Sequence, residues 1–265
     1  MSTVVPGCLA IALYLFSTAR ILRTSKDGQS IFSVFSMTGI AGTVALVCHG
    51  LTIYSKTVIE TGLNLDVFTT ASIIAWLMAL LVLCGGKLRP VASLSLVIFP
   101  FSGILIGISL AFSADMLVAE SLSIRIHIAL SLLSYSLFTA ATFQAIYIAV
   151  ADHKIKNHTP IMKILPPLIM MEELLFRITS VAFILLTLGI LVGISGVENV
   201  LEQHLSHKIV FSLIAWFIFL ALLSGRYLKG WRGKKAANLV IGGSLCLAMG
   251  FLGSKFVLEV LLTKV

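Results

Sequence analysis

The stretch that decides the fold is Ile178-Thr-Ser-Val-Ala-Phe-Ile-Leu-Leu-Thr-Leu-Gly-Ile-Leu-Val-Gly-Ile194, which contains no charged residue. The segment Glu173-Leu-Leu-Phe-Arg177 stands before it, and Glu198 and Glu202 follow it. About 20 predominantly apolar residues allow a helix to cross the hydrocarbon core of a bilayer. The stretch therefore predicts a transmembrane helix with charged residues beyond both of its ends.

The composition of the whole chain supports this reading. Hydrophobic residues make up 58% of the 265 and charged residues 11%, and the mean hydropathy is +1.07. A soluble globular protein is about 45–50% apolar and about 25% charged. The sequence therefore predicts an all-α, polytopic membrane protein in the lipid bilayer. The four cysteines stand singly, without a CxxC pair or a CxxCH haem-attachment motif, and indicate packing residues.

Outward from the deciding stretch, eight apolar runs are long enough to span a membrane. Pro166-Pro167 ends any preceding helix, so Met170–Arg177 is predicted as a short interfacial segment that leads into the sixth span. We expect residues 1–265 to form a single integral membrane domain. The predicted spans are 4–22, 32–53, 67–84, 91–112, 124–151, 174–196, 207–225 and 236–262.

Charge alternates between the two sides of these spans. Four connections carry 13 of the 19 lysines and arginines, whereas the intervening connections are acidic. By the positive-inside rule the basic connections face the cytoplasm, which places both termini outside in a bacterial cell inner membrane. The net charge of +8 then reflects membrane topology, and no nucleic-acid partner is predicted. The basic connections are Arg20–Gln29, Gly85–Pro90, Asp152–Pro167 and Arg226–Lys235.

The sequence also contains one internal match. Ser72-Ile-Ile-Ala-Trp76 corresponds to Ser212-Leu-Ile-Ala-Trp216 at an offset of 140 residues, and each copy lies in a span that ends in a basic connection. A duplication of four spans preserves orientation and gives parallel repeats. The match predicts a four-plus-four arrangement of helices.

The histidines gather at one predicted depth. His49, His127, His204 and His207 all map to the outer third of the protein, whereas His153 and His158 fall in a basic, solvated cytoplasmic loop. Histidine is expensive inside a bilayer and is the commonest side-chain ligand of metals. The outer histidines are therefore candidate ligands, and His207, which directly abuts an apolar run, is a better candidate than His204.

His127 begins a polar stripe, because Ser131, Ser134 and Tyr135 follow it at helical spacings. We expect this stripe to face other helices. Packing offers a second explanation, since serines let helices approach closely and a histidine can simply hydrogen-bond a neighbour.

Two chemistries suit the outer histidines. Two neutral imidazoles, from His127 and His207 with His49 as the next candidate, can ligate a haem iron, while a basic residue at the outer edge pairs with a propionate. The same histidines with Glu198 or Glu202 can instead hold a divalent transition metal. A proton- or sodium-coupled pump is disfavoured, because no acidic residue lies at the centre of a predicted span. The candidate propionate partners are Arg125, Lys208 and Lys255.

Several motifs resemble a known family. They are Met171-Glu-Glu-Leu-Leu-Phe-Arg177, Phe183–Gly193, His207-Lys208, Ala215-Trp216, Trp231-Arg-Gly233, Phe251-Leu-Gly253, and His127 with Leu132-Leu-Ser-Tyr135. Together they resemble the cytochrome c assembly protein family (CcsA/HemX-like membrane proteins) over roughly residues 120–255, with a weaker similarity at Gly62–Trp76. The resemblance implies a membrane protein that handles haem, with His127 in the place of an external histidine of the family.

The chain departs from the family where haem is presented. Members that deliver haem to apocytochromes carry a tryptophan-rich external loop with a Trp-Asp-Pro-Lys-Glu sequence, whereas this chain has Leu205-Ser-His-Lys-Ile-Val210 and retains only the lysine. The second external histidine is also absent, since the corresponding region ends in Glu259-Val-Leu-Leu. The resemblance thus implies a short branch of the family without this loop.

We therefore expect haem binding with an accessory role in cytochrome biogenesis or haem supply, with haem and other membrane or cytochrome assembly proteins as partners. The alternative is a cobalt or nickel transport or efflux-related protein, and a third possibility is a membrane scaffold subunit. No nucleophile and base pair, phosphate loop or paired carboxylates indicate an enzyme.

Overall fold

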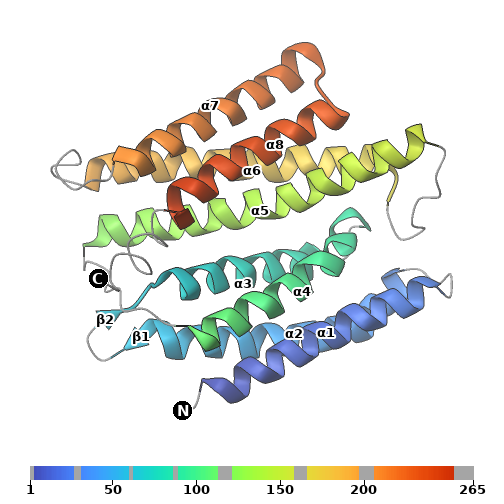
Figure 1. The fold of residues 1–265 in the computed structure, drawn as a ribbon, viewed down its shortest axis with the longest axis vertical. Coiled ribbons are helices and arrows are strands. Elements are labelled where there is room, and N and C mark those ends of the chain that lie inside the picture. Colours follow the sequence, from blue (N-terminus) through green and yellow to red (C-terminus); the bar gives the residue numbers. More distant parts are fainter. Residues whose placement is uncertain are drawn as a thin grey trace. The chain divides into compact units, whose positions relative to one another are not determined.

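The structure is a computed structural model that describes residues 3–26, 31–59, 62–85, 89–112, 121–157, 166–196 and 206–253. Eight helices and one small hairpin account for almost all of these residues (Figure 1). The helices are α1 (Val4–Lys26), α2 (Ile31–Thr57), α3 (Val67–Gly85), α4 (Arg89–Ala111), α5 (Leu122–Lys156), α6 (Leu168–Gly196), α7 (Ser206–Lys229) and α8 (Gly233–Ala248).

The all-α, polytopic fold predicted from the sequence is confirmed. Seven of the helices, α1 to α7, are long and apolar enough to cross a membrane within the described residues. Helix α8 is described over 16 residues and continues as a single π turn, Met249–Gly253. The last part of the predicted eighth span lies outside the described residues.

Two helices extend further than their predicted spans. Helix α6 begins at Leu168, directly after Pro166-Pro167, so Met170–Arg177 is its first part and does not form the separate interfacial segment that we predicted. Proline is well tolerated immediately before a helix, where the first N–H groups have no helical partner. Helix α5 likewise continues to Lys156, so His153 lies on an exposed helical turn and not in a loop.

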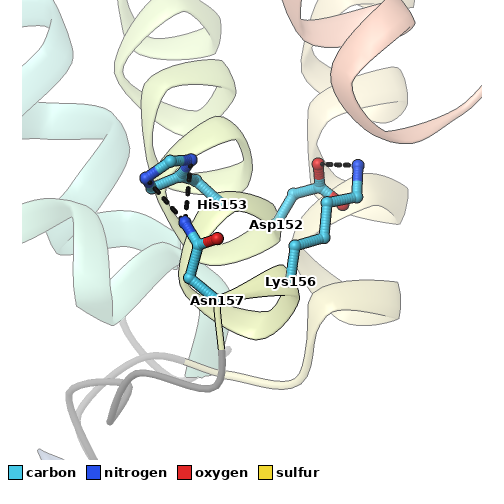
Figure 2. Close-up of polar contacts among 4 residues, drawn as sticks. All are labelled: Asp152, His153, Lys156 and Asn157. Carbon is cyan, nitrogen blue, oxygen red and sulfur yellow. Dashed lines mark hydrogen bonds and ion pairs between the residues drawn. The ribbon is translucent and has the colours of Figure 1, made fainter.

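Figure 2 shows polar contacts at the end of α5, where His153, Lys156 and Asn157 are exposed. The Lys156 ammonium forms an ion pair with Asp152 at 2.8 Å, and the Asn157 side-chain amide lies 3.0 Å from His153 Nε2. Both pairs join residues four apart, which are neighbours on a helix surface. His153 therefore makes a contact with Asn157 on the surface of its own helix. His158 lies outside the described residues.

The chain divides into two compact units, each built on four helices. Unit 1 comprises Met1–Val118 with Ile161–Pro167, and unit 2 comprises Ala119–Pro160 with Leu168–Val265. In unit 1, α1 and α3 each pack against both α2 and α4. In unit 2, α5 and α7 each pack against both α6 and α8, so the helices follow the same packing order in the two units.

The connection between α2 and α3 and the end of α4 are held by charged residues that bind backbone groups. The strands β1 (Val58–Ile59) and β2 (Gly62–Leu63) form an antiparallel hairpin between α2 and α3. Asp66 then accepts hydrogen bonds from the backbone N–H groups of Phe68 and Thr69 at 2.8 and 3.0 Å and begins α3. The Lys56 ammonium donates to the Ser109 carbonyl near the end of α4. These contacts satisfy helix-terminal groups that lipid cannot satisfy.

The two copies of the internal sequence match make related contacts. In unit 1 the Trp76 indole Nε1–H donates to the Leu46 carbonyl of α2 at 2.9 Å. In unit 2 the Trp216 indole Nε1–H donates to the Thr187 hydroxyl of α6 at 3.0 Å. Each tryptophan thus joins the third helix of its unit to the second. These contacts support the predicted four-plus-four duplication, which we retain as a proposal together with the single membrane domain.

Candidate functional site

His127 lies near the start of α5, where the sequence begins its polar stripe. The hydroxyl of Ser121 caps the helix by accepting a hydrogen bond from the backbone N–H of Ile124 at 3.3 Å. His127 follows within the second turn and is partly buried. The cap therefore fixes the backbone from which the imidazole extends.

The imidazole of His127 is oriented by a single strong contact. Its Nδ1 lies 2.7 Å from the carbonyl oxygen of Gly189 on α6. A carbonyl only accepts hydrogen bonds, so Nδ1 carries the proton and donates it. In the neutral ring the proton-free nitrogen is then Nε2, the state that a metal-ligating histidine requires.

Two glycines on α6 face His127, since Gly193 makes room for the ring and Gly189 supplies the carbonyl that binds it. A Cβ atom on Gly193 would lie 2.7 Å from His127 Nδ1 and 2.8 Å from its Cε1, closer than such atoms approach in real proteins. Gly189 is the carbonyl partner, and a Cβ atom there would lie 3.6 Å from the Ser131 hydroxyl, an ordinary contact. Gly189 and Gly193 are one turn apart and lie on the same face of α6. Together they form the cradle of His127.

The polar stripe faces neighbouring helices, as the sequence predicts. The Ser134 hydroxyl is buried and donates to the Ala182 carbonyl of α6 at 3.0 Å. The Tyr135 ring packs against Phe251, with the two ring centroids 5.0 Å apart. The stripe therefore also contributes to packing. His127, at the N-terminal end of the stripe, is the member whose second ring nitrogen has no hydrogen bond among the described residues.

The other candidates of unit 2 are less defined. Arg125 is exposed on the first turns of α5, two residues before His127. His207 and Lys208 belong to the first turn of α7, but their side chains lie outside the described ones. Glu198, Glu202, His204 and Lys255 also lie outside the described residues. The predicted pairing of His127 with His207 thus stays a prediction.

His49 has different surroundings in unit 1. Its ring is fully buried, with an exposed fraction of 0%, and Nε2 lies 2.9 Å from the Ser72 hydroxyl of α3. Its Nδ1 lies 3.5 Å from the Tyr14 hydroxyl of α1. The Tyr14 ring in turn stacks on Phe99 of α4, with centroids 5.3 Å apart. Both ring nitrogens of His49 are engaged, so the cluster of Tyr14, His49 and Ser72 connects helices and offers no free ligand atom.

Within the described parts of the chain, no group of three or more His, Cys, Asp and Glu side chains is arranged to hold a metal ion. The cradle of Gly189 and Gly193 was not anticipated from the sequence. Its only signal there is the spacing of two glycines by four residues within an apolar run, which is also typical of ordinary helix packing.

Comparisons with known proteins identify the family of this chain. The family model described as cytochrome C assembly protein matches residues 37–262. The chain belongs to this family. The match includes most of α2 and the whole of α3 to α8, so it covers both His49 and His127.

Two curated relatives mark the range of similarity. The inner membrane protein YpjD of Escherichia coli K12 is 27% identical over 229 residues, which are 84% of this chain and 86% of the relative. The cytochrome c biogenesis protein CcsA of Gloeobacter violaceus is 32% identical over 91 residues, or 34% of this chain and 27% of the relative. No solved structure matches. With its seven candidate spans, this family member is a multi-pass inner-membrane protein related to cytochrome biogenesis.

Proposed function

We propose that this protein binds haem through His127 and has an accessory role in cytochrome biogenesis or haem supply. The observation that carries the proposal is the hydrogen bond from His127 Nδ1 to the Gly189 carbonyl. It leaves Nε2 unprotonated and fixes the plane of the ring. The donor set therefore fits a haem iron, for which a histidine nitrogen is a common axial ligand.

Other residues would complete the site. Arg125, exposed near His127, would pair with a haem propionate, and so would Lys208. His207 would be the second histidine to hold the haem iron. The haem supplies an iron centre when it is bound, and the chain itself supplies orientation, charge pairing and an apolar surrounding.

We propose a binding role and not a catalytic one. The sequence contains no nucleophile and base pair, phosphate loop or paired carboxylates. The two adjacent acids Glu172 and Glu173 do not form a pair, because Glu172 is buried whereas Glu173 is exposed and bonded to Arg177.

An accessory role also agrees with the positions of the tryptophans. Trp76 and Trp216 serve helix packing, and Trp231 lies at the α7–α8 connection, so none belongs to a tryptophan-rich external loop.

The test is a visible absorption spectrum of the detergent-purified protein, followed by haem titration. The wild-type protein should show a Soret band. His127→Ala should abolish or shift this band, since an axial nitrogen is lost. His153→Ala is the matched control, because His153 lies on the same helix but at its other, exposed end (Figure 2). A wild-type protein that takes up no haem would refute the function, and an unchanged band in the His127→Ala variant would refute the ligand.

A further inference from the structure

The connection between α7 and α8 in unit 2 is built around Trp231. Gly230 and Gly233 on either side have positive φ angles of 64° and 62°, a conformation that glycine adopts without strain. The backbone N–H of Gly230 donates to the Arg226 carbonyl at 3.1 Å, and that of Trp231 donates to the Gly225 carbonyl at 3.2 Å. The indole lies so close to Gly225 that a Cβ atom there would be 2.3 Å from the ring. Trp231 therefore has a fixed position.

Two cations are held at this tryptophan. The Arg226 guanidinium donates to the Trp231 carbonyl at 3.5 Å and lies 4.6 Å from the centroid of the Phe176 ring on α6. The Lys235 ammonium lies 3.6 Å from the centroid of the Trp231 ring. Both are cation–π arrangements, which fix a charged group over an aromatic face. The structure thus brings the motif Met171–Arg177 together with the motif Trp231–Gly233. The role proposed for His127 does not explain either motif.

No described carboxylate neutralises these two charges. In the described part of unit 2, Asp152 is paired with Lys156, and Glu173 is paired with Arg177. Glu172 is the remaining acid there; it is only 9% exposed, faces Gly233, and forms no ion pair with Arg226 or Lys235. Arg226 and Lys235 both contact Trp231, so an anion bound beside this residue would be attracted by both positive charges.

The surroundings of these cations indicate what kind of anion would bind beside them. Arg226 is followed by Tyr227 and Leu228, whose exposed fractions are 92% and 78%. The candidate span of α7 ends at Lys229, so these residues lie where the chain leaves the hydrocarbon. Exposed aromatic and apolar side chains beside lysine and arginine are typical of the headgroup level of a membrane.

We propose that Arg226, Trp231 and Lys235 form a binding site for the phosphate headgroup of an anionic phospholipid. The guanidinium has further N–H donors available beyond the one directed at Trp231, in a planar arrangement that matches phosphate oxygens. The ammonium, held over the indole, supplies the second charge. The exposed Tyr227 and Leu228 contact the acyl chains and glycerol region of the same leaflet. This site is independent of haem binding at His127.

The test is the thermal unfolding of the detergent-purified protein with added lipid. Phosphatidylglycerol should raise the unfolding temperature, whereas phosphatidylcholine should not, because its headgroup carries no net charge. Arg226→Gln and Lys235→Gln should each weaken the apparent affinity for phosphatidylglycerol about fivefold. Lys156→Gln is the matched control, since it removes an exposed lysine at the end of α5 whose charge is already paired with Asp152.

Other variants and additives separate the alternatives. Arg226→Lys keeps the charge but loses the planar donors, and should give a smaller loss of affinity than Arg226→Gln. Lys235 is exposed, so its replacement leaves the fold intact and provides a readout even if Arg226→Gln fails to fold. An equal response of wild type and both glutamine variants would overturn the proposal. Stabilisation by inorganic phosphate as strong as that by phosphatidylglycerol would also overturn it, since the site would then bind a soluble anion.

Discussion

At the residue scale, the decisive pair is a histidine and the glycines that face it. His127 Nδ1 is bonded to Gly189, and the missing side chain of Gly193 provides the space for the ring. His49 has the same predicted depth in the sequence, yet both of its ring nitrogens are engaged by Ser72 and Tyr14. Two histidines that look alike in the sequence therefore differ in whether a nitrogen is free for a ligand.

The cradle of His127 predicts a contrast between its two glycines. In Gly193→Ala the new methyl group overlaps the imidazole, which must move and lose its bond to Gly189; we expect a destabilisation of about 1–3 kcal/mol. If haem is bound, its affinity should fall about tenfold, because the orienting contact is lost. Gly189→Ala meets only an ordinary contact and should cost less than about 1 kcal/mol.

Thermal unfolding and haem titration of both variants check this contrast. The two glycines lie one turn apart on α6, so any general effect of alanine on the helix is common to both. Equal behaviour of the two variants would show that the ring does not lie in the cradle.

At the element scale, helix ends and connections are fixed by a few specific contacts. Asp66 begins α3 immediately after the hairpin, and Pro166-Pro167 determines where α6 begins. In the connection from α7 to α8, Trp231 packs on Gly225 and orders the turn. The equivalent positions of Trp76 and Trp216 between helices support the proposed duplication.

This packing predicts a second contrast between glycines, now in the α7–α8 hairpin. Gly225→Ala places a methyl group into the Trp231 ring, which must leave its position, and we expect a loss of about 1–3 kcal/mol. Gly242→Ala meets nothing within 4 Å on α8 and should be neutral or stabilising by up to about 1 kcal/mol. Unfolding temperatures in detergent measure both effects. Tryptophan fluorescence should change in Gly225→Ala alone. An unchanged emission spectrum in this variant would argue against the contact between Gly225 and Trp231.

At the scale of the whole molecule, the distribution of charge predicts the orientation in the membrane. Basic connections alternate with acidic ones along the chain. By the positive-inside rule, reporters of cytoplasmic location should be active when fused after Lys87, Lys156 or Lys234 and inactive after Thr57, Glu120 or Glu202. A reversed pattern would place His127 on the cytoplasmic side and would contradict an external haem site.

The proposed role predicts a specific phenotype for a deletion strain. Loss of the gene should alter cytochrome or haem levels without changing tolerance to cobalt or nickel. A divalent metal transporter predicts the opposite, namely lower tolerance and a higher metal content. A cation that crosses the hydrocarbon needs polar groups along its whole path, and mid-membrane carboxylates that would supply them are absent from the sequence. Spectra of membrane cytochromes and growth on cobalt or nickel measure the two outcomes.

The sequence alone determined that the elements are membrane-length helices, and seven of the eight predicted spans are found among the described residues. Backbone groups in hydrocarbon must be hydrogen-bonded within the segment itself. A long apolar run such as Ile178–Ile194 can therefore cross the membrane only as a helix. The motifs taken together, with that of His127 among them, also indicated the family, which the match over residues 37–262 confirms.

Only the tertiary structure decided which side chains meet. Helices in lipid associate through complementary shapes and a few hydrogen bonds, and the hydropathy of a sequence predicts neither. For this reason the sequence could not distinguish the engaged nitrogens of His49 from the Nε2 of His127, which has no hydrogen bond among the described residues, nor foresee the role of Gly193. The same reason applies to Phe176 and Trp231, which lie far apart in the sequence and meet around Arg226 because three helix ends come together there.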